Sequence, residues 1–269
     1  MINLSDLRQF KAQGRKFSCL TCYDASMAKA MEIAEIDTIL IGDSLGMTIQ
    51  GHDSTLPVSV EDMAYHTAAV RRGNQHALIM TDLPFMSYAT LDHALQHAKT
   101  VMQAGAQMVK IEGGAWLADI VQNLTRNGIP VCVHLGLTPQ SVHVLGGYKL
   151  QAKSRDAADQ LIADCQAVVE AGAAVLLLEC VPAQLGKEIA ALFPHTPVIG
   201  IGAGVDTDGQ VLVVQDMLGL NFGHMARFVR NFMKEQQGEN AIVDAFKTYH
   251  AAVRDQSFPA REHTFQVEL

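Results

Sequence analysis

The fold is decided by residues 36–43, IDTILIGD, in which an apolar run ends at the carboxylate of Asp43. An apolar run of this length is typical of a strand that is buried on both faces. The same pattern recurs further along the chain, where apolar runs end at Asp82, Glu112 and Glu179. A carboxylate at such a place is costly unless it meets a metal ion, a cation or a substrate. We therefore expect parallel strands whose carboxyl ends meet at one site.

Strand-like and helix-like segments alternate along the 269 residues, which favours repeated βα units. A short N-terminal helix is expected around residues 4–10, and an extra C-terminal helix near residues 239–253. Units in this number favour an α/β fold that closes as a (β/α)8 TIM barrel over an open sheet. The expected strands lie near residues 17–23, 37–42, 77–82, 106–112, 130–134, 173–179, 196–201 and, after a poor start at Gly209 and Gln210, 211–214. The helices between them are expected near residues 24–35, 60–73, 91–104, 115–127, 155–171, 182–193 and 222–235.

The length suits one barrel domain that covers residues 1–269, because α/β barrels of this size are commonly undivided. The tail after about residue 255 has no clear periodicity, which is consistent with a mobile segment. Two connections, residues 44–59 and 135–154, are too long for simple turns. Because both follow the carboxyl ends of strands, we expect them to act as lids or binding loops.

Composition excludes several classes of protein. Apolar residues make up 49% of the chain and charged residues 18%, which indicates a globular core rather than disorder. The formal net charge of -8 argues against a nucleic-acid binder, which would carry a basic patch. The longest apolar stretch, about residues 173–181, contains Glu179 and is too short to span a bilayer. The N-terminus shows no secretion signal, so we expect a cytoplasmic protein without a membrane partner.

Three of the strand-end acids, Asp43, Asp82 and Glu112, indicate an oxygen-rich site. Carboxylates without clustered His or Cys suit Mg²⁺ or Mn²⁺ rather than zinc. Mg²⁺ keeps open positions, and a 2-oxo acid can fill two of them with its keto and carboxylate oxygens. The metal ion would then act as a Lewis acid on a developing enolate.

Other candidates for chemistry lie beside these acids. Lys110 and Glu112 are two apart on a strand and leave on one face, so they form either a structural ion pair or a substrate site. Ser44 offers a hydroxyl and a backbone N–H to an anionic oxygen. Glu179 follows three leucines, and an apolar setting that disfavours its charge would let it serve as a base near neutral pH. His134 ends a strand and either binds a substrate oxygen or satisfies a neighbour.

The cysteines indicate structure rather than chemistry. All 5 are scattered, which does not suggest a disulfide framework. Cys19 and Cys22 form a C-x-x-C, but they fall within an expected strand. Residues three apart on a strand point to opposite faces, so this pair cannot hold a metal ion together.

The chain also resembles the ketopantoate hydroxymethyltransferase family, and the resemblance extends in order over nearly all of it. The runs that carry it begin at Gly42, Thr81, Ala104 and Ile129, and LGGYKLQ, LLLECVP, PVIGIGAG and DGQ follow. The first four runs read GDSLGMTIQGHDSTLPVSVEDMAYHTAAVRRG, TDLPFMSYAT, AGAQMVKIEGG and IPVCVHLGLTPQSV.

The resemblance implies a (β/α)8 barrel similar to enzymes that act on phosphoenolpyruvate and pyruvate. It implies Mg²⁺-dependent transfer of a hydroxymethyl group from 5,10-methylenetetrahydrofolate to 3-methyl-2-oxobutanoate. The product is 2-dehydropantoate, a precursor of pantothenate, and family members form large homo-oligomers, often homodecamers.

The roles of individual residues follow from the same resemblance. The metal-site acids of the family match Asp43, Asp82 and Glu112, and the proton acceptor matches Glu179. The substrate contacts of the family match Asp43, Ser44, Asp82 and Lys110, and we add His134 as a candidate substrate contact.

Two other functions remain open from the sequence. A related barrel lyase or mutase would share the Mg²⁺ enolate chemistry but would need no folate. A non-catalytic barrel that serves as a scaffold would be expected to have lost site residues, whereas here the matched acids and Lys110 are all present.

Overall fold

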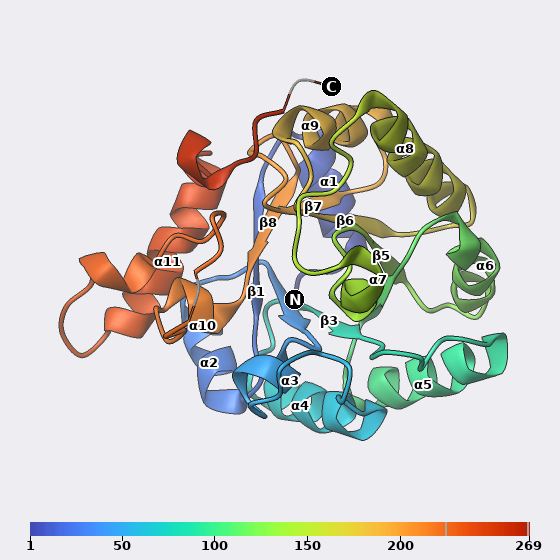
Figure 1. Ribbon diagram of the computed structural model, residues 1–269. Coiled ribbons are helices and arrows are strands. Elements are labelled where there is room, and N and C mark those ends of the chain that lie inside the picture. The colour runs from blue at the N-terminus through green and yellow to red at the C-terminus, as the bar shows by residue number, and fades with distance from the viewer. Residues whose placement is uncertain (224, 268) are drawn as a thin grey trace.

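The computed structural model describes residues 1–223, 225–267 and 269, and its strands close into a barrel in chain order (Figure 1). Every neighbouring pair is parallel, including β1 with β8. The prediction of a closed (β/α)8 barrel is therefore confirmed. The strands are β1 (Phe17–Thr21), β2 (Thr38–Ile41), β3 (Leu78–Asp82), β4 (Met108–Glu112), β5 (Val131–Gly136), β6 (Val175–Glu179), β7 (Val198–Ile201) and β8 (Gly209–Leu212).

Helices surround this barrel, and most of them lie where the sequence periodicity predicts them (Figure 1). The longer helices are α1 (Leu4–Ala12), α2 (Ala25–Ile33), α4 (Val60–Gly73), α5 (Leu91–Ala104), α6 (Ala118–Arg126), α8 (Arg155–Glu170), α9 (Ala183–Leu192) and α11 (Ala241–Arg254). The short ones are α3 (Leu45–Thr48), α7 (Val142–Leu145) and α10 (Val214–Met217), with 3₁₀ turns η1 (Ala115–Leu117), η2 (Pro139–Ser141), η3 (Phe232–Glu235) and η4 (Arg261–His263). No helix in the described ranges has both the length and the apolar character needed to span a bilayer.

Side-chain caps explain where several helices begin. Asn3 accepts hydrogen bonds from the first turn of α1 and Asp6 bonds back, which forms a capping box. Ser59 and Asp62 form the same arrangement at α4. Because a cap satisfies backbone N–H groups that have no partner inside the helix, these residues fix where α1 and α4 begin.

The strands alternate between two apolar clusters. Met80, Met108 and Cys132 belong to the cluster in the barrel lumen, which also includes Leu7 and Phe10 of α1. The adjacent residues on the same strands, such as Ile79, Val109 and Val133, pack into the outer cluster beneath the surrounding helices. Since α1 contributes to the lumen cluster, the opposite end of the barrel, at the carboxyl ends of the strands, is the end available for a site.

The same alternation separates the two cysteines of the C-x-x-C. Cys19 lies in the lumen cluster and Cys22 in the outer cluster. All 5 cysteines are free and buried, which confirms the structural interpretation.

Two predicted elements need correction. Strand β8 begins at Gly209 rather than residue 211, because Gly209 pairs with Phe17 of β1 and Ile199 of β7. A glycine is needed there, since a Cβ would be 2.4 Å from the ring of Phe17. The helix expected over residues 222–235 is wrong for the described part of that range, in which the only helical turn is η3; residue 224 lies outside the described residues. Arg230 stacks over the ring of Phe232, and Phe232 packs on Tyr249 of α11. Tertiary packing therefore sets this segment rather than helical periodicity.

Candidate active site

A cavity of about 580 Å³ opens at the carboxyl ends of the strands. Its wall includes every side chain that the sequence analysis selected for the site. These side chains are Asp43, Ser44, Asp82, Lys110, Glu112, His134 and Glu179. The first and the last of them, Asp43 and Glu179, are more than a hundred residues apart in the sequence. The acids therefore share one cavity, as the strand-end pattern predicts.

Strand register explains why these side chains meet. Asp82 is paired with Lys110 on the neighbouring strand, and Glu112 is paired with His134. Asp82 and Lys110 follow the lumen residues of their strands by two positions, so they also face the lumen. The polar ends of β3, β4 and β5 thus form one layer above the apolar filling of the barrel.

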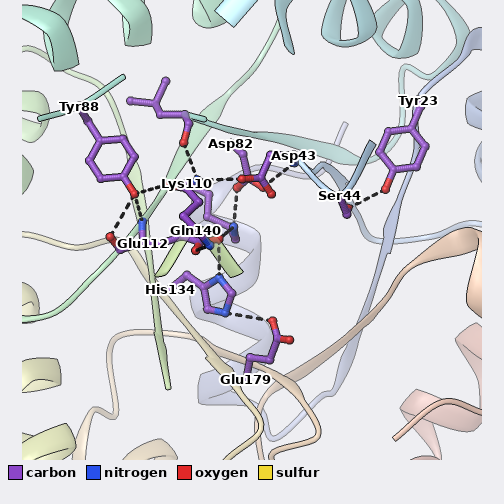
Figure 2. Close-up of polar contacts among 11 residues, drawn as sticks. Tyr23, Asp43, Ser44, Asp82, Tyr88, Lys110, Glu112, His134, Gln140 and Glu179 are labelled. Atoms are coloured by element: carbon purple, nitrogen blue, oxygen red, sulfur yellow. Dashed lines mark hydrogen bonds and ion pairs between the residues drawn. The ribbon is translucent and has the colours of Figure 1, made fainter. Parts of the chain in front are cut away.

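Lys110 lies at the centre of this layer (Figure 2). Its Nζ donates to Asp82 Oδ1 at 2.6 Å and to Glu112 Oε1 at 3.3 Å, and all three side chains are nearly inaccessible to water. The ion pair between Lys110 and Glu112, one of the two alternatives from the sequence, is therefore present. Because the pair lies in the cavity wall, a structural and a functional role of Lys110 are compatible.

The charges in this layer are unbalanced. Burial raises the pKa of Asp43 well above its usual range, and the charges of Asp82 and Glu112 raise it further. Burial also raises the pKa of Asp82, against the opposing effect of Lys110. Burial alone would lower the pKa of Lys110, but the charges of Asp82, Glu112 and Asp43 outweigh it and raise that pKa well above the ordinary value. Three carboxylates around one ammonium favour the binding of a further cation.

His134 links two of the strand-end acids. Its Nδ1 lies 3.2 Å from Glu112 Oε1, and its Nε2 lies 3.2 Å from Glu179 Oε2, although that second contact is too poorly aligned for a hydrogen bond. Burial and Lys110 lower the pKa of His134, but Glu112 and Glu179 outweigh both and raise it to about 9. Lys110 and His134 in turn overcome the burial of Glu112 and hold its pKa at about 2.

Gln140 and Tyr88 belong to this site but were not selected from the sequence. The Gln140 amide donates to Asp43 Oδ2 at 2.8 Å, and its backbone N–H donates to Glu112 Oε2 at 3.0 Å. The Tyr88 hydroxyl donates to Gln140 Oε1 at 2.5 Å and accepts from the Glu112 backbone N–H (Figure 2). These two side chains orient the acids. Gln140 lies in the connection of residues 135–154, whose length was the only signal that could have identified it.

The other long connection also contributes to the cavity. Ser44, at the start of residues 44–59, shares a 2.8 Å hydrogen bond with the hydroxyl of Tyr23. A Cβ at Gly42 would lie 2.8 Å from Ser44 Oγ, so the glycine allows this close approach. Met47 from this connection and Tyr148 from residues 135–154 both line the cavity, and the Tyr148 hydroxyl lies 3.6 Å from Met47 Sδ. The two connections thus meet over the site, as expected for binding loops.

The donor set fits a hard divalent cation. Carboxylate oxygens are the ligands that Mg²⁺ prefers, and a cation would offset the excess negative charge around Lys110. Within the described ranges, however, no three His, Cys, Asp or Glu side chains converge closely enough to hold a metal ion unaided. Mg²⁺ usually takes one or two carboxylates and keeps water or substrate as its other ligands, so the acids fit it as partial ligands.

Comparison with known proteins defines first the class and then the family. Phosphonopyruvate hydrolase has the same fold, with a TM-score of 0.63 at 13% identity over 97% of this chain and 100% of that one. 2,3-Dimethylmalate lyase, a member of the PEP mutase/isocitrate lyase superfamily, aligns over 100% of both chains with a TM-score of 0.58 at 12% identity. The chain therefore shares its TIM-barrel fold with these two enzymes.

Sequence similarity is more specific. The pattern of ketopantoate hydroxymethyltransferases matches residues 1–261. The 3-methyl-2-oxobutanoate hydroxymethyltransferase of Acinetobacter baumannii strain AYE is 87% identical over 269 residues, which is 100% of both chains. The chain belongs to the ketopantoate hydroxymethyltransferase family.

Proposed function

We propose that this protein transfers a hydroxymethyl group from 5,10-methylenetetrahydrofolate to 3-methyl-2-oxobutanoate and so forms 2-dehydropantoate for pantothenate biosynthesis. Water supplies the hydroxyl oxygen, and tetrahydrofolate leaves. The full-length identity of 87% to a relative of that name is the observation that supports the proposal most. The shared cavity of acids, Lys110 and Glu179 supports it independently.

The residues take separate roles in this proposal. Lys110, Ser44 and His134 bind the oxygen atoms of the keto acid, with Asp43 and Asp82 close by. Glu179 removes the proton from C3, since its carboxylate lines the cavity and is partly accessible, with 13% of the side chain exposed. His134 contacts Glu179 and so keeps this carboxylate oriented.

A cation fits the same layer of side chains. We propose that Asp43, Asp82 and Glu112 hold Mg²⁺, with water and substrate as additional ligands. When bound, the cation would supply Lewis-acid stabilisation of negative charge on the keto oxygen. Gln140 and Tyr88 hold the acids in place for it through the hydrogen bonds described above.

We also propose, from the family, that residues 1–269 act as one domain, that the chains assemble into a homodecamer and that the enzyme is cytoplasmic. Several large apolar side chains on the barrel exterior support assembly. Tyr65 is 71% exposed and Trp116 is 65% exposed. Side chains of this kind are commonly covered in oligomers.

The activity has a direct test. Purified protein with Mg²⁺, 3-methyl-2-oxobutanoate and 5,10-methylenetetrahydrofolate should form 2-dehydropantoate, which mass spectrometry detects. Omission of the folate should abolish the product, whereas conversion of the keto acid to a different product without folate would favour the lyase or mutase alternative. If Mg²⁺ and the keto acid together fail to raise the thermal midpoint, a scaffold role would be supported instead.

The Asp82→Ala variant should need much more Mg²⁺ than the wild type, because it removes a carboxylate from the proposed cation site. We expect the Mg²⁺ concentration for half-maximal activity to rise about 10- to 100-fold, as one charge-assisted ligand is lost. Titration of activity against Mg²⁺ measures this shift. Asp119→Ala on the exposed face of α6 is the matched control. An unchanged titration in Asp82→Ala would exclude Asp82 as a ligand.

A further inference from the structure

The cavity is larger than the keto acid requires. A cavity of about 580 Å³ is of the size that accommodates a drug-sized ligand, whereas 3-methyl-2-oxobutanoate is a five-carbon acid. Most of the charged side chains come from β3 to β6 and from the connection after β2, and the exceptions are Asp216 and Arg227. The side of the cavity beyond β7 and β8 has a different lining, chiefly apolar, which includes Ile201, Val211, Val213 and Phe228. That second region is available to a second ligand.

One carboxylate lies in this second region. Asp216 belongs to α10, which follows β8 (Figure 1), and it lines the cavity together with Asn221. The Asn221 side chain donates to Asp216 Oδ1 at 2.9 Å and so fixes the carboxylate. Burial raises the pKa of Asp216 because it disfavours the charged carboxylate. A ligand that donates hydrogen bonds would stabilise that charged form. Each carboxylate oxygen can accept more than one hydrogen bond, so both can still bind a ligand.

Aromatic rings lie in the same region. A Cβ at Gly202, directly after β7, would lie 3.0 Å from the ring of Phe228 and 3.2 Å from the ring of Phe265. Both rings therefore pack on the end of β7, and both line the cavity. Flat heteroaromatic ligands gain from contact with aromatic faces or edges of this kind.

We propose that Asp216 and these rings bind the pterin ring of the folate donor. The inference rests on the proposed function, because it assumes a tetrahydrofolate substrate. The pyrimidine edge of a pterin carries a ring N–H next to an amino group, and these two donors match the two oxygens of a carboxylate. The apolar walls and rings exclude water from the bicyclic ring. The pterin then shares one cavity with the keto acid bound near Lys110 and Glu179, as transfer of a carbon between them requires.

The test is Asp216→Asn, which keeps the shape but turns one acceptor into a donor that faces the donors of the pterin. We expect the Kd for tetrahydrofolate, measured by calorimetry, to rise about 10- to 100-fold. The Kd for 6-methyltetrahydropterin, which lacks the tail but keeps the same edge, should rise by the same factor. The KM for the keto acid and its folate-free deuterium exchange at C3 should stay at wild-type values. Asp119→Asn is the matched control.

The outcomes separate the subsite from the activity. Unchanged binding of tetrahydrofolate by Asp216→Asn would overturn the assignment while leaving the transferase activity intact. Weaker binding of tetrahydrofolate with unchanged binding of 6-methyltetrahydropterin would also overturn it, since Asp216 would then contact the tail. A wild-type enzyme that forms no 2-dehydropantoate would remove the proposed function itself, whatever the variant does.

Discussion

The Glu179→Gln variant should lose about 10²- to 10⁴-fold in turnover, with only a modest loss of keto-acid binding. Glutamine keeps the size of the side chain and its contact with His134 but cannot accept the proton from C3. The loss should therefore appear in the proton-removal step rather than in substrate affinity. A fall in kcat with a nearly unchanged KM is the kinetic sign of an interaction made only in the transition state.

Deuterium exchange isolates that step. The enzyme with Mg²⁺ and 3-methyl-2-oxobutanoate in D₂O, without folate, should incorporate deuterium at C3, and NMR spectroscopy follows the loss of the C3 proton signal. Glu179→Gln should slow this exchange as much as it slows turnover. Glu61→Gln, on the exposed side of α4 and outside the cavity wall, controls for the loss of one carboxylate. Exchange at the wild-type rate in Glu179→Gln would remove this residue from the role of base.

An alternative hypothesis is that His134, rather than Glu179, takes the proton from C3. If His134 rather than Glu179 took the proton, its raised pKa of about 9 would leave too little of the neutral form at pH 7 to act efficiently. Both side chains line the cavity, but 13% of the Glu179 side chain is exposed against 3% of His134, so the carboxylate is the more accessible acceptor. We therefore keep Glu179 as the proposed base and His134 as the side chain that orients it.

The strand-end acids were predictable because two simple rules locate them. Apolar runs define buried strands, and parallel strands bring their carboxyl ends to one end of a barrel. Asp82, Lys110 and Glu112 could therefore be assigned to one face of the barrel before any coordinates were known. The lumen cluster directly below them confirms that assignment.

The rest of the site depends on loops, for which periodicity gives no rule. Gln140 reaches Asp43 across 97 residues of sequence, and its position depends on how the connection after β5 folds back over the mouth. Asp216 lies in a four-residue helix that no pattern distinguishes from a loop. The prediction of a helix over residues 222–235 was wrong for a similar reason, because contacts with α11 outweigh local helix propensity there. Local patterns thus identify the acids but not the residues that orient them or the second half of the cavity.

The Lys110→Met variant should lose about 3–5 kcal/mol of unfolding free energy, the largest stability effect expected for a single substitution at this site. Methionine fills the space of the lysine stem but leaves Asp82 and Glu112 buried without their cation. Urea denaturation in the presence of a chelator measures the loss. Lys29→Met is the matched control, since Lys29 is 63% exposed and pairs with Glu32 at the surface. That variant should change stability by less than about 1 kcal/mol.

The pH dependence of this loss tests its electrostatic cause. Burial already raises the pKa of Asp82 in the wild type, and removal of Lys110 takes away the charge that opposes this rise. A carboxyl group whose pKa is higher in the folded than in the unfolded state destabilises the fold as pH rises through its folded pKa, and the penalty vanishes below its unfolded pKa. The deficit of Lys110→Met should therefore be larger at pH 8 than at pH 5. An equal deficit at both values would mean that lost packing, not unpaired charge, destabilises the variant.

A second substitution then separates the two partners of the lysine. In the Lys110→Met/Asp82→Asn double variant the remaining pair of side chains is uncharged, so part of the lost stability should return. Two independent effects would instead add. Because Asp82→Asn alone removes a carboxylate from a site with excess negative charge, it should cost less than Lys110→Met does. A double variant no more stable than Lys110→Met would contradict the view that Asp82 and Lys110 act as one buried pair, and Glu112 would then be the partner that needs the lysine.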